Sequence, residues 1–79
     1  MTRNDLQDIV IKALHSLDGK ATIAQICHYI WDNYEDELRH SGDLFYTWQY
    51  GMRWAGQKLR HAGKLVDAQK TPHGYWVLK

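Results

Sequence analysis

Cysteine, proline and long apolar runs are scarce in this chain. It has one Cys and one Pro, and no uninterrupted hydrophobic run approaches the ~20 residues that span a bilayer. A single Cys cannot form a disulfide within the chain, and disulfide-free proteins are typical of reducing compartments. The first residues also lack the basic and apolar regions of a secretory signal. We therefore expect a soluble cytoplasmic protein that does not act within a membrane.

Acidic residues are absent from one long stretch, between Leu44 and Val66. Residues 1–44 contain four Lys and Arg against eight Asp and Glu, a balance of 4 − 8 = −4. Residues 45–79 contain six against one, a balance of 6 − 1 = +5, and the net charge of +1 hides this division. Such an asymmetry favours a face that meets a polyanion, although the same pattern also arises from solvation alone.

The length of 79 residues predicts a single domain near the lower size limit for one hydrophobic core. Four Trp and five Tyr bury large areas, so this core needs no disulfide. Apolar residues at i, i+3, i+4, i+7, i+8 and i+11 predict a first amphipathic helix over Leu6–Leu17, capped by Asn4 or Asp5. Ala21 is expected in a very short strand after it.

The same spacing recurs from Ile23 and predicts a second helix to at least Asn33, with Leu38 in line to continue its apolar stripe. Thr22 and Gln25 stand three residues apart at its start. This spacing is typical of a capping box, in which each side chain bonds the other residue's backbone N–H.

The third and longest predicted helix covers Leu44 to Ala62, with Asp43 as the expected N-cap and Gly63 as the expected stop. At ~100° of turn per residue, one face forms a core stripe: Leu44, Trp48, Met52, Ala55, Leu59 and Ala62. The opposite face carries Tyr46, Tyr50, Arg53 and Gln57, with Trp54 and His61 beside it. A surface helix with no other task would carry Glu and Lys there, so this face is a candidate binding surface. Trp54 is expected to pack against the second helix or the C-terminal strands.

After Gly63 the apolar period changes from 3.6 to 2, which predicts two strands over residues 64–68 and 75–79. The intervening residues 69–74 contain the Pro and a Gly, as expected of a hairpin loop. Trp76 and Leu78 share one strand face and, with Leu65, are expected to cover the core stripe of the long helix.

Helix, short strand, helix, long helix and hairpin is the element order of a winged helix-turn-helix. The predicted fold class is therefore α+β, with three helices and a C-terminal two-stranded β-hairpin wing in one domain over residues 1–79. In such domains the third helix enters the major groove of DNA and the wing contacts the neighbouring backbone. Other winged helices bind proteins, so the fold alone leaves the function open.

Residues 51–65 and 73–79 resemble the N-terminal winged-helix domain of Mrr-type restriction endonucleases. The resemblance rests on Trp54-Ala55, Leu59, Ala62-Gly63 and Gly74-Tyr75-Trp76. His73 stands where that family often has Arg, and Lys64 interrupts the usual Ala-Gly-Leu run. The family's nuclease domain is absent, so the resemblance implies a DNA-binding module of a restriction, modification or regulatory system and implies no cleavage.

The predicted partner is double-stranded DNA. Arg53 is the first candidate for base contact, since Arg forks onto guanine O6 and N7, and Gln57 is suited to adenine. The tyrosines would bond phosphates or stack on a base, and the basic residues would contact phosphates. The competing interpretation is solvation or a phosphate contact for Arg53, and solvation for Gln57 and the lysines. For the two tyrosines it is a hydrophobic patch that binds another protein, and for His73 it is a role in forming the turn. The candidate DNA-binding residues are Tyr46, Tyr50, Arg53, Gln57, Lys58, Arg60, Lys64, Lys70 and His73.

Enzymatic and metal-binding functions find little support. The five His and Cys27 show neither i, i+4 pairing nor C-x-x-C spacing, and Cys27 falls on a buried stripe. No phosphate loop, nucleophile elbow or carboxylate pair is present. We predict no enzyme, no cofactor and no small-molecule substrate.

The main alternative is a protein-interaction or dimerisation module without DNA binding. In that case Tyr46, Tyr50 and Trp54 would be its anchors, because Tyr, Trp and Arg are enriched at binding hot spots. A homodimer or a larger complex is compatible with both functions.

Overall fold

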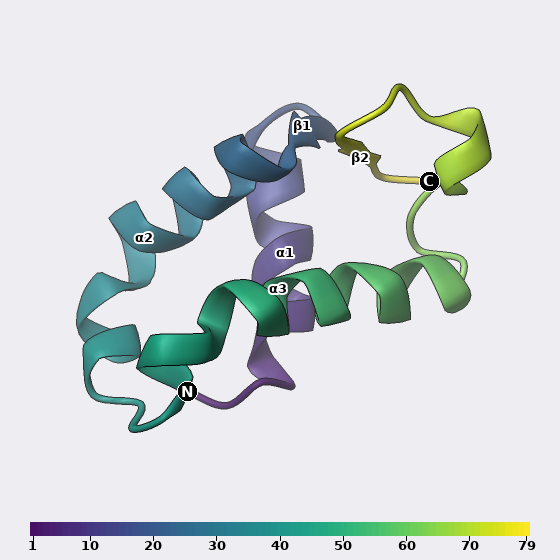
Figure 1. Ribbon diagram of the computed structural model, residues 1–79. Coiled ribbons are helices and arrows are strands. Elements are labelled where there is room, and N and C mark those ends of the chain that lie inside the picture. Colours follow the sequence, from purple (N-terminus) through teal and green to yellow (C-terminus); the bar gives the residue numbers. More distant parts are fainter.

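The computed structural model describes all 79 residues. Three helices, a two-stranded antiparallel sheet and one 3-10 turn make an α+β fold (Figure 1). In chain order these are α1 (Asp5–Ser16), β1 (Lys20–Thr22), α2 (Ile23–Arg39), α3 (Leu44–His61), η1 (Ala68–Lys70) and β2 (Tyr75–Val77). No helix combines the length and the apolar character that a membrane crossing requires.

The three predicted helices are confirmed, and α2 extends to the end of its apolar stripe. Its reach past Asn33 includes a kink at Tyr34, whose φ of −130° and ψ of 16° leave the helical region. The predicted capping box is present: Gln25 N donates to Thr22 Oγ1 over 3.1 Å, and Thr22 N donates to Gln25 Oε1 over 2.8 Å. Asn4 and Asp43 occupy the predicted cap positions of α1 and α3, but neither side chain accepts a capping hydrogen bond.

The prediction for the C-terminal strands is half right. Tyr75–Val77 forms β2, and its sheet partner is β1, with Ala21 opposite Trp76. The expected strand over residues 64–68 is reduced to a bridge between Leu65 and Leu78 and a bond from Val66 N to the carbonyl of Val77. β2 therefore lies between β1 and residues 64–66.

The shortening begins at Asp67, where the chain turns into η1. Lys70 N and the hydroxyl of Thr71 both donate to the Asp67 carbonyl, over 3.0 and 2.7 Å. Asp, Ala and Lys have low strand propensity, so a local turn replaces the pairing that the alternating pattern of residues 64–68 predicted.

The core lies where α1 crosses α2 and α3, and β2 closes it at one end (Figure 1). As predicted, Trp76 and Leu65 are buried against the core stripe of α3. Two buried glycines of α3 permit this packing. A Cβ at Gly51 would meet Leu6 Cδ1 at 2.8 Å, and a Cβ at Gly56 would meet Trp76 Cη2 at 2.4 Å. Glycine at these positions lets α1 and β2 approach the backbone of α3.

Candidate functional site

The outer face of α3 is displayed as the sequence predicted. Tyr46 and Tyr50 are 80% and 78% exposed and are the only large hydrophobic side chains in the protein with such exposure. Arg53 and Gln57 are exposed as well. The predicted core stripe is buried at Trp48, Met52, Ala55 and Leu59. At its two ends Leu44 is half-buried and Ala62, the C-cap, is exposed, so the prediction is wrong for Ala62. Aromatic, cationic and amide groups therefore line one side of an 18-residue helix.

Cationic groups on this face have no carboxylate partners. α3 contains no Asp or Glu, and the only ion pair in the protein joins Arg39 to Glu35 of α2 over 2.8 Å. Arg53 and Lys58 are exposed and take part in no ion pair. Their charges are therefore available to an external anion.

Arg60 differs from the other predicted phosphate contacts. Its side chain is half-buried, one terminal nitrogen donates to the Tyr75 carbonyl over 3.2 Å, and Nε is buried without a partner. The guanidinium thus ties α3 to β2. No sequence pattern predicts this contact, because it depends on where β2 crosses α3.

The remaining predicted basic residues gather beyond the C-terminal end of α3. Lys64 follows the helix after Gly63, whose φ of +76° is the left-handed stop that glycine favours. Lys70 ends η1 and His73 precedes β2, and all three side chains are exposed. Tyr46 lies at the other end of α3, so the predicted set extends along the helix, about 27 Å at 1.5 Å per residue, and onto the segment that follows.

Trp54 is contacted by a residue from the N-terminal segment. The guanidinium carbon of Arg3 lies 4.2 Å from the centre of its ring, so the N-terminal segment covers Trp54, a contact that was not predicted. The segment is fixed in turn by Thr2 N, which donates to the Asp5 carboxylate over 2.8 Å. Trp54 is consequently half-covered and forms the flank of the outer face, away from α2.

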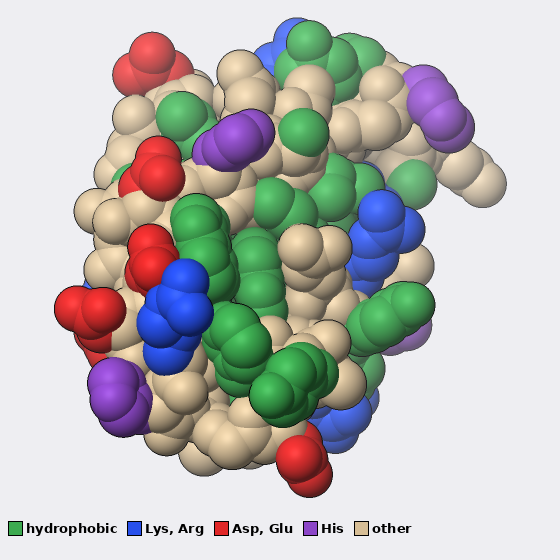
Figure 2. All heavy atoms as spheres, turned by 60° about the vertical axis from the view of Figure 1, so that its left-hand side comes forward, with side chains coloured by type: hydrophobic (Ala, Val, Ile, Leu, Met, Phe, Trp, Pro, Cys, Tyr) green, Lys and Arg blue, Asp and Glu red, His purple; other side chains and the backbone are tan.

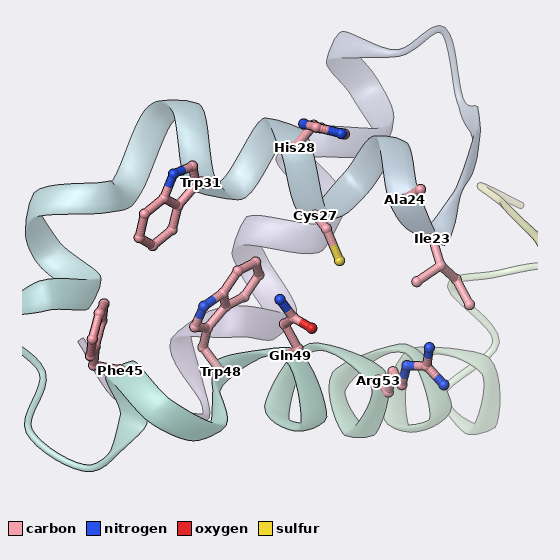
Figure 3. Close-up of a pocket in the computed structure, with 9 residues that line it drawn as sticks. All are labelled: Ile23, Ala24, Cys27, His28, Trp31, Phe45, Trp48, Gln49 and Arg53. Carbon is pink, nitrogen blue, oxygen red and sulfur yellow. The ribbon is translucent and has the colours of Figure 1, made fainter.

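An open groove separates α2 from α3, and the sequence did not reveal it (Figure 3). It encloses about 730 Å³. Trp31 of α2 and Trp48 of α3 point toward each other across it, with ring centres 6.3 Å apart and planes within 13°. The groove is lined by Ile23, Ala24, Cys27, His28, Trp31, Phe45, Trp48, Gln49 and Arg53.

Cys27 belongs to this groove and is half-buried, not fully buried in the core as predicted. Its Sγ lies 3.6 Å from Met52 Sδ. Desolvation raises the pKa of the Cys27 thiol above its ordinary value of 9.0, and the positive charge of Arg53 offsets part of this rise. Arg53 therefore acts electrostatically on the groove while its side chain is exposed at the rim.

The charged side chains that adjoin the groove are arginines. Arg53 of α3 lines it, and no Asp or Glu does. Figure 2 shows acidic side chains beside the apolar area. The acids of α2 are Asp32, Glu35, Asp36 and Glu37, and they line a separate hollow. Arg39 of α2 bonds Glu35 and also reaches the groove. It lies 5.3 Å from the Trp31 ring centre and 5.6 Å from that of Phe45, and it covers the end of the groove near the α2–α3 turn.

No family model, curated protein or solved structure matches the chain. No three His, Cys, Asp or Glu side chains come together in a way that could hold a metal ion. Two surfaces thus stand out on this protein: the outer face of α3 with the basic segment after it, and the apolar groove between α2 and α3.

Proposed function

We propose that the protein is a winged helix-turn-helix domain that binds double-stranded DNA, with the outer face of α3 in the major groove. The observation that carries the proposal is the combination on one helix of exposed Tyr46, Tyr50, Arg53 and Gln57 with an absence of acidic residues and ion pairs. An α-helix fits the major groove, where Arg and Gln pair with base edges.

The segment after α3 supplies the second contact in this proposal. Lys64, Lys70 and His73 are exposed beyond the end of the helix, where a wing would meet the neighbouring phosphates. The order in which β2 lies between β1 and residues 64–66 is compatible with a short wing. Arg60 is left out of the contact set because it bonds the Tyr75 carbonyl.

Fluorescence anisotropy with a labelled random duplex tests the proposal. Binding should weaken as salt rises, with a slope of roughly −0.9 in log K against log salt for each phosphate contact. Arg53→Ala should weaken the binding free energy for duplex DNA by about 1–3 kcal/mol. Lys64→Ala should reduce the slope of log K against log salt by roughly one. Lys12→Ala is the matched control, since it removes one charge from an exposed position of α1. Equal losses from Arg53→Ala and Lys12→Ala would mean that net charge, not α3, drives the binding.

The groove favours a second candidate function, the recognition of a protein. Exposed apolar surface that joins a groove marks many protein interfaces, and aromatic side chains dominate their binding energy. Trp31, Phe45 and Trp48 line such a groove, and Tyr46 adjoins Phe45 at a ring distance of 5.1 Å. This function uses the side of α3 that faces α2, and it shares Arg53 and Tyr46 with the DNA contact.

A further inference from the structure

We propose that the groove between α2 and α3 binds a small aromatic anion of the aryl carboxylate class, with Arg53 as the partner of its charge. Binding of this ligand goes beyond both functions proposed above. Its effect on DNA, argued below, rests on the proposed contact between Arg53 and the duplex.

The size and lining of the groove are those of a small-molecule site. Its volume of about 730 Å³ lies within the roughly 300–1,000 Å³ of ligand pockets. Six of its nine lining residues are hydrophobic, and the polar ones are His28, Gln49 and Arg53. An apolar lining with a few polar groups that orient the ligand is typical of such pockets. A standard protein interface engages about 20–30 residues a side, far more than line this groove.

The apolar part of the groove suits a planar ring. The rings of Trp31 and Trp48 point toward each other with their planes within 13°, and the ring centre of Phe45 lies 6.4 Å from that of Trp31 (Figure 3). Trp48 is buried, so packing in the core fixes its orientation before a ligand arrives. Aromatic pairs gain energy from offset-stacked and edge-to-face contacts beyond their buried area. An aryl group therefore gains more here than an aliphatic chain of the same size.

The charges around the groove select an anion. No Asp or Glu lines it, and Arg53, which takes part in no ion pair, is its one lining Lys or Arg. The positive charge of Arg53 acts inside the groove, since it offsets part of the rise that desolvation causes in the pKa of the Cys27 thiol. The second arginine, Arg39, is already bonded to Glu35 and covers the end near Phe45. The carboxylate of the ligand should therefore lie toward Arg53 and its aryl group toward the tryptophans.

Gln49 lies between the aromatic and the cationic parts of the groove. Figure 3 shows its amide directed into the groove between Trp48 and Arg53, and an amide N–H can donate to the carboxylate beside Arg53. Trp48 and Arg53 are separated by about 7.5 Å of helix rise at 1.5 Å per residue. A bicyclic aryl acetate has a similar length, so it can contact both residues.

Ligand in the groove would withdraw Arg53 from DNA. A guanidinium that forks onto a carboxylate cannot at the same time fork onto guanine. The ligand should therefore lower the affinity for duplex DNA, which makes it an effector of the proposed DNA binding.

Two probes that differ in charge test the ligand class: 1-naphthylacetate and its neutral amide, 1-naphthylacetamide. In ¹H–¹⁵N titrations of the chain without DNA, both should shift the indole N–H signals of Trp31 and Trp48 and the side-chain amide of Gln49. The anion should bind about fivefold more tightly, the upper value for an ion pair at an exposed rim. Equal affinities overturn the proposal. Shifts that do not saturate by about 10 mM, where a ligand with a Kd of about 1 mM fills most sites, also overturn it and leave the groove to a protein partner.

Two variants identify the cation. Arg53→Gln removes the charge from an exposed position and should abolish the preference for the anion, whereas Lys12→Gln removes a charge from α1 and should keep it. Unchanged circular dichroism spectra show that both variants fold, and the two probes on the natural chain decide the proposal even if one does not. A preference that survives Arg53→Gln contradicts the assigned partner.

Anisotropy of a labelled duplex at constant ionic strength tests the effect on DNA. 1-Naphthylacetate should release the duplex at concentrations that fill the groove, and equal occupancy by 1-naphthylacetamide should release less. Ligand binding without release contradicts the effect on DNA and leaves the ligand site standing. A chain that binds no duplex refutes the DNA function alone, because the ligand titration contains no DNA.

Discussion

Replacing Gly56 by Ala should destabilise the protein even though Ala is the better helix former. An added Cβ would lie 2.4, 2.5 and 2.9 Å from Cη2, Cζ2 and Cζ3 of Trp76, well inside van der Waals contact. Trp76 is 5% exposed and lies on β2, so the indole can move away only by disturbing the sheet. Overpacking costs about 1–3 kcal/mol, and three contacts under 3.0 Å with a buried indole place Gly56→Ala in the upper part of that range, at about 2–3 kcal/mol. The gain in helix propensity returns at most about 1 kcal/mol.

We therefore expect a net loss of roughly 1–2 kcal/mol, or a melting temperature lower by roughly 5–15 °C for a domain of this size. Urea unfolding followed by tryptophan fluorescence measures the free energy. Gly51→Ala is the matched control, because the closest contact of its added Cβ is the flexible end of Leu6 at 2.8 Å. It should lower the free energy of unfolding by less than Gly56→Ala does. In a Trp76→Leu background, Gly56→Ala should become neutral or stabilising, since the clash is gone. A Gly56→Ala protein as stable as the natural chain would falsify the close approach of β2 to α3.

Three further perturbations have defined outcomes. Thr22→Ala removes the cap of α2 and should lower the unfolding free energy by about 1 kcal/mol in urea titrations, and an unchanged midpoint would argue against the capping box. Arg60→Met breaks the bond to the Tyr75 carbonyl and should reduce stability by about 1 kcal/mol while duplex affinity falls little; a large loss of affinity with stability intact would return Arg60 to the DNA contact. Alkylation of Cys27 by iodoacetamide between pH 7 and 10 should titrate above the ordinary thiol range, because desolvation disfavours the thiolate. Arg53→Ala removes a charge that stabilises the thiolate, so it should move that titration to still higher pH, and a shift to lower pH would contradict the geometry.

The helices could be predicted because each carries a continuous apolar stripe with a period of 3.6. The stripe of α2 runs from Ile23 to Leu38. The stripe did not predict the kink at Tyr34. Motifs contained within four residues could also be predicted, and the Thr22–Gln25 capping box is confirmed. Asn4 and Asp43 make no capping bond because their backbone is itself helical, with φ and ψ of −65° and −32° and of −61° and −26°. A capping side chain needs an extended backbone, and Thr22 has one, with a ψ of 160°.

Features that depend on how elements meet could not be predicted. The groove exists because α2 and α3 diverge from their connecting turn, and no period in the sequence encodes that angle (Figure 3). The need for glycine at position 56 comes from Trp76, which lies 20 residues further along the chain and packs directly against it. Arg60 lies on α3 among predicted phosphate contacts, yet β2 runs close enough to engage it. Arg3, in the segment before α1, lies over the Trp54 ring, and no local pattern links the two residues.

The central claim is that the outer face of α3 binds duplex DNA, and a ¹H–¹⁵N chemical-shift titration tests it most directly. On adding a random duplex at low salt, the largest shifts should fall on Tyr46, Tyr50, Arg53 and Gln57 and on residues 64–73, and they should vanish as salt rises. Shifts that centre on α1, or a spectrum unmoved by duplex at low salt, would contradict it.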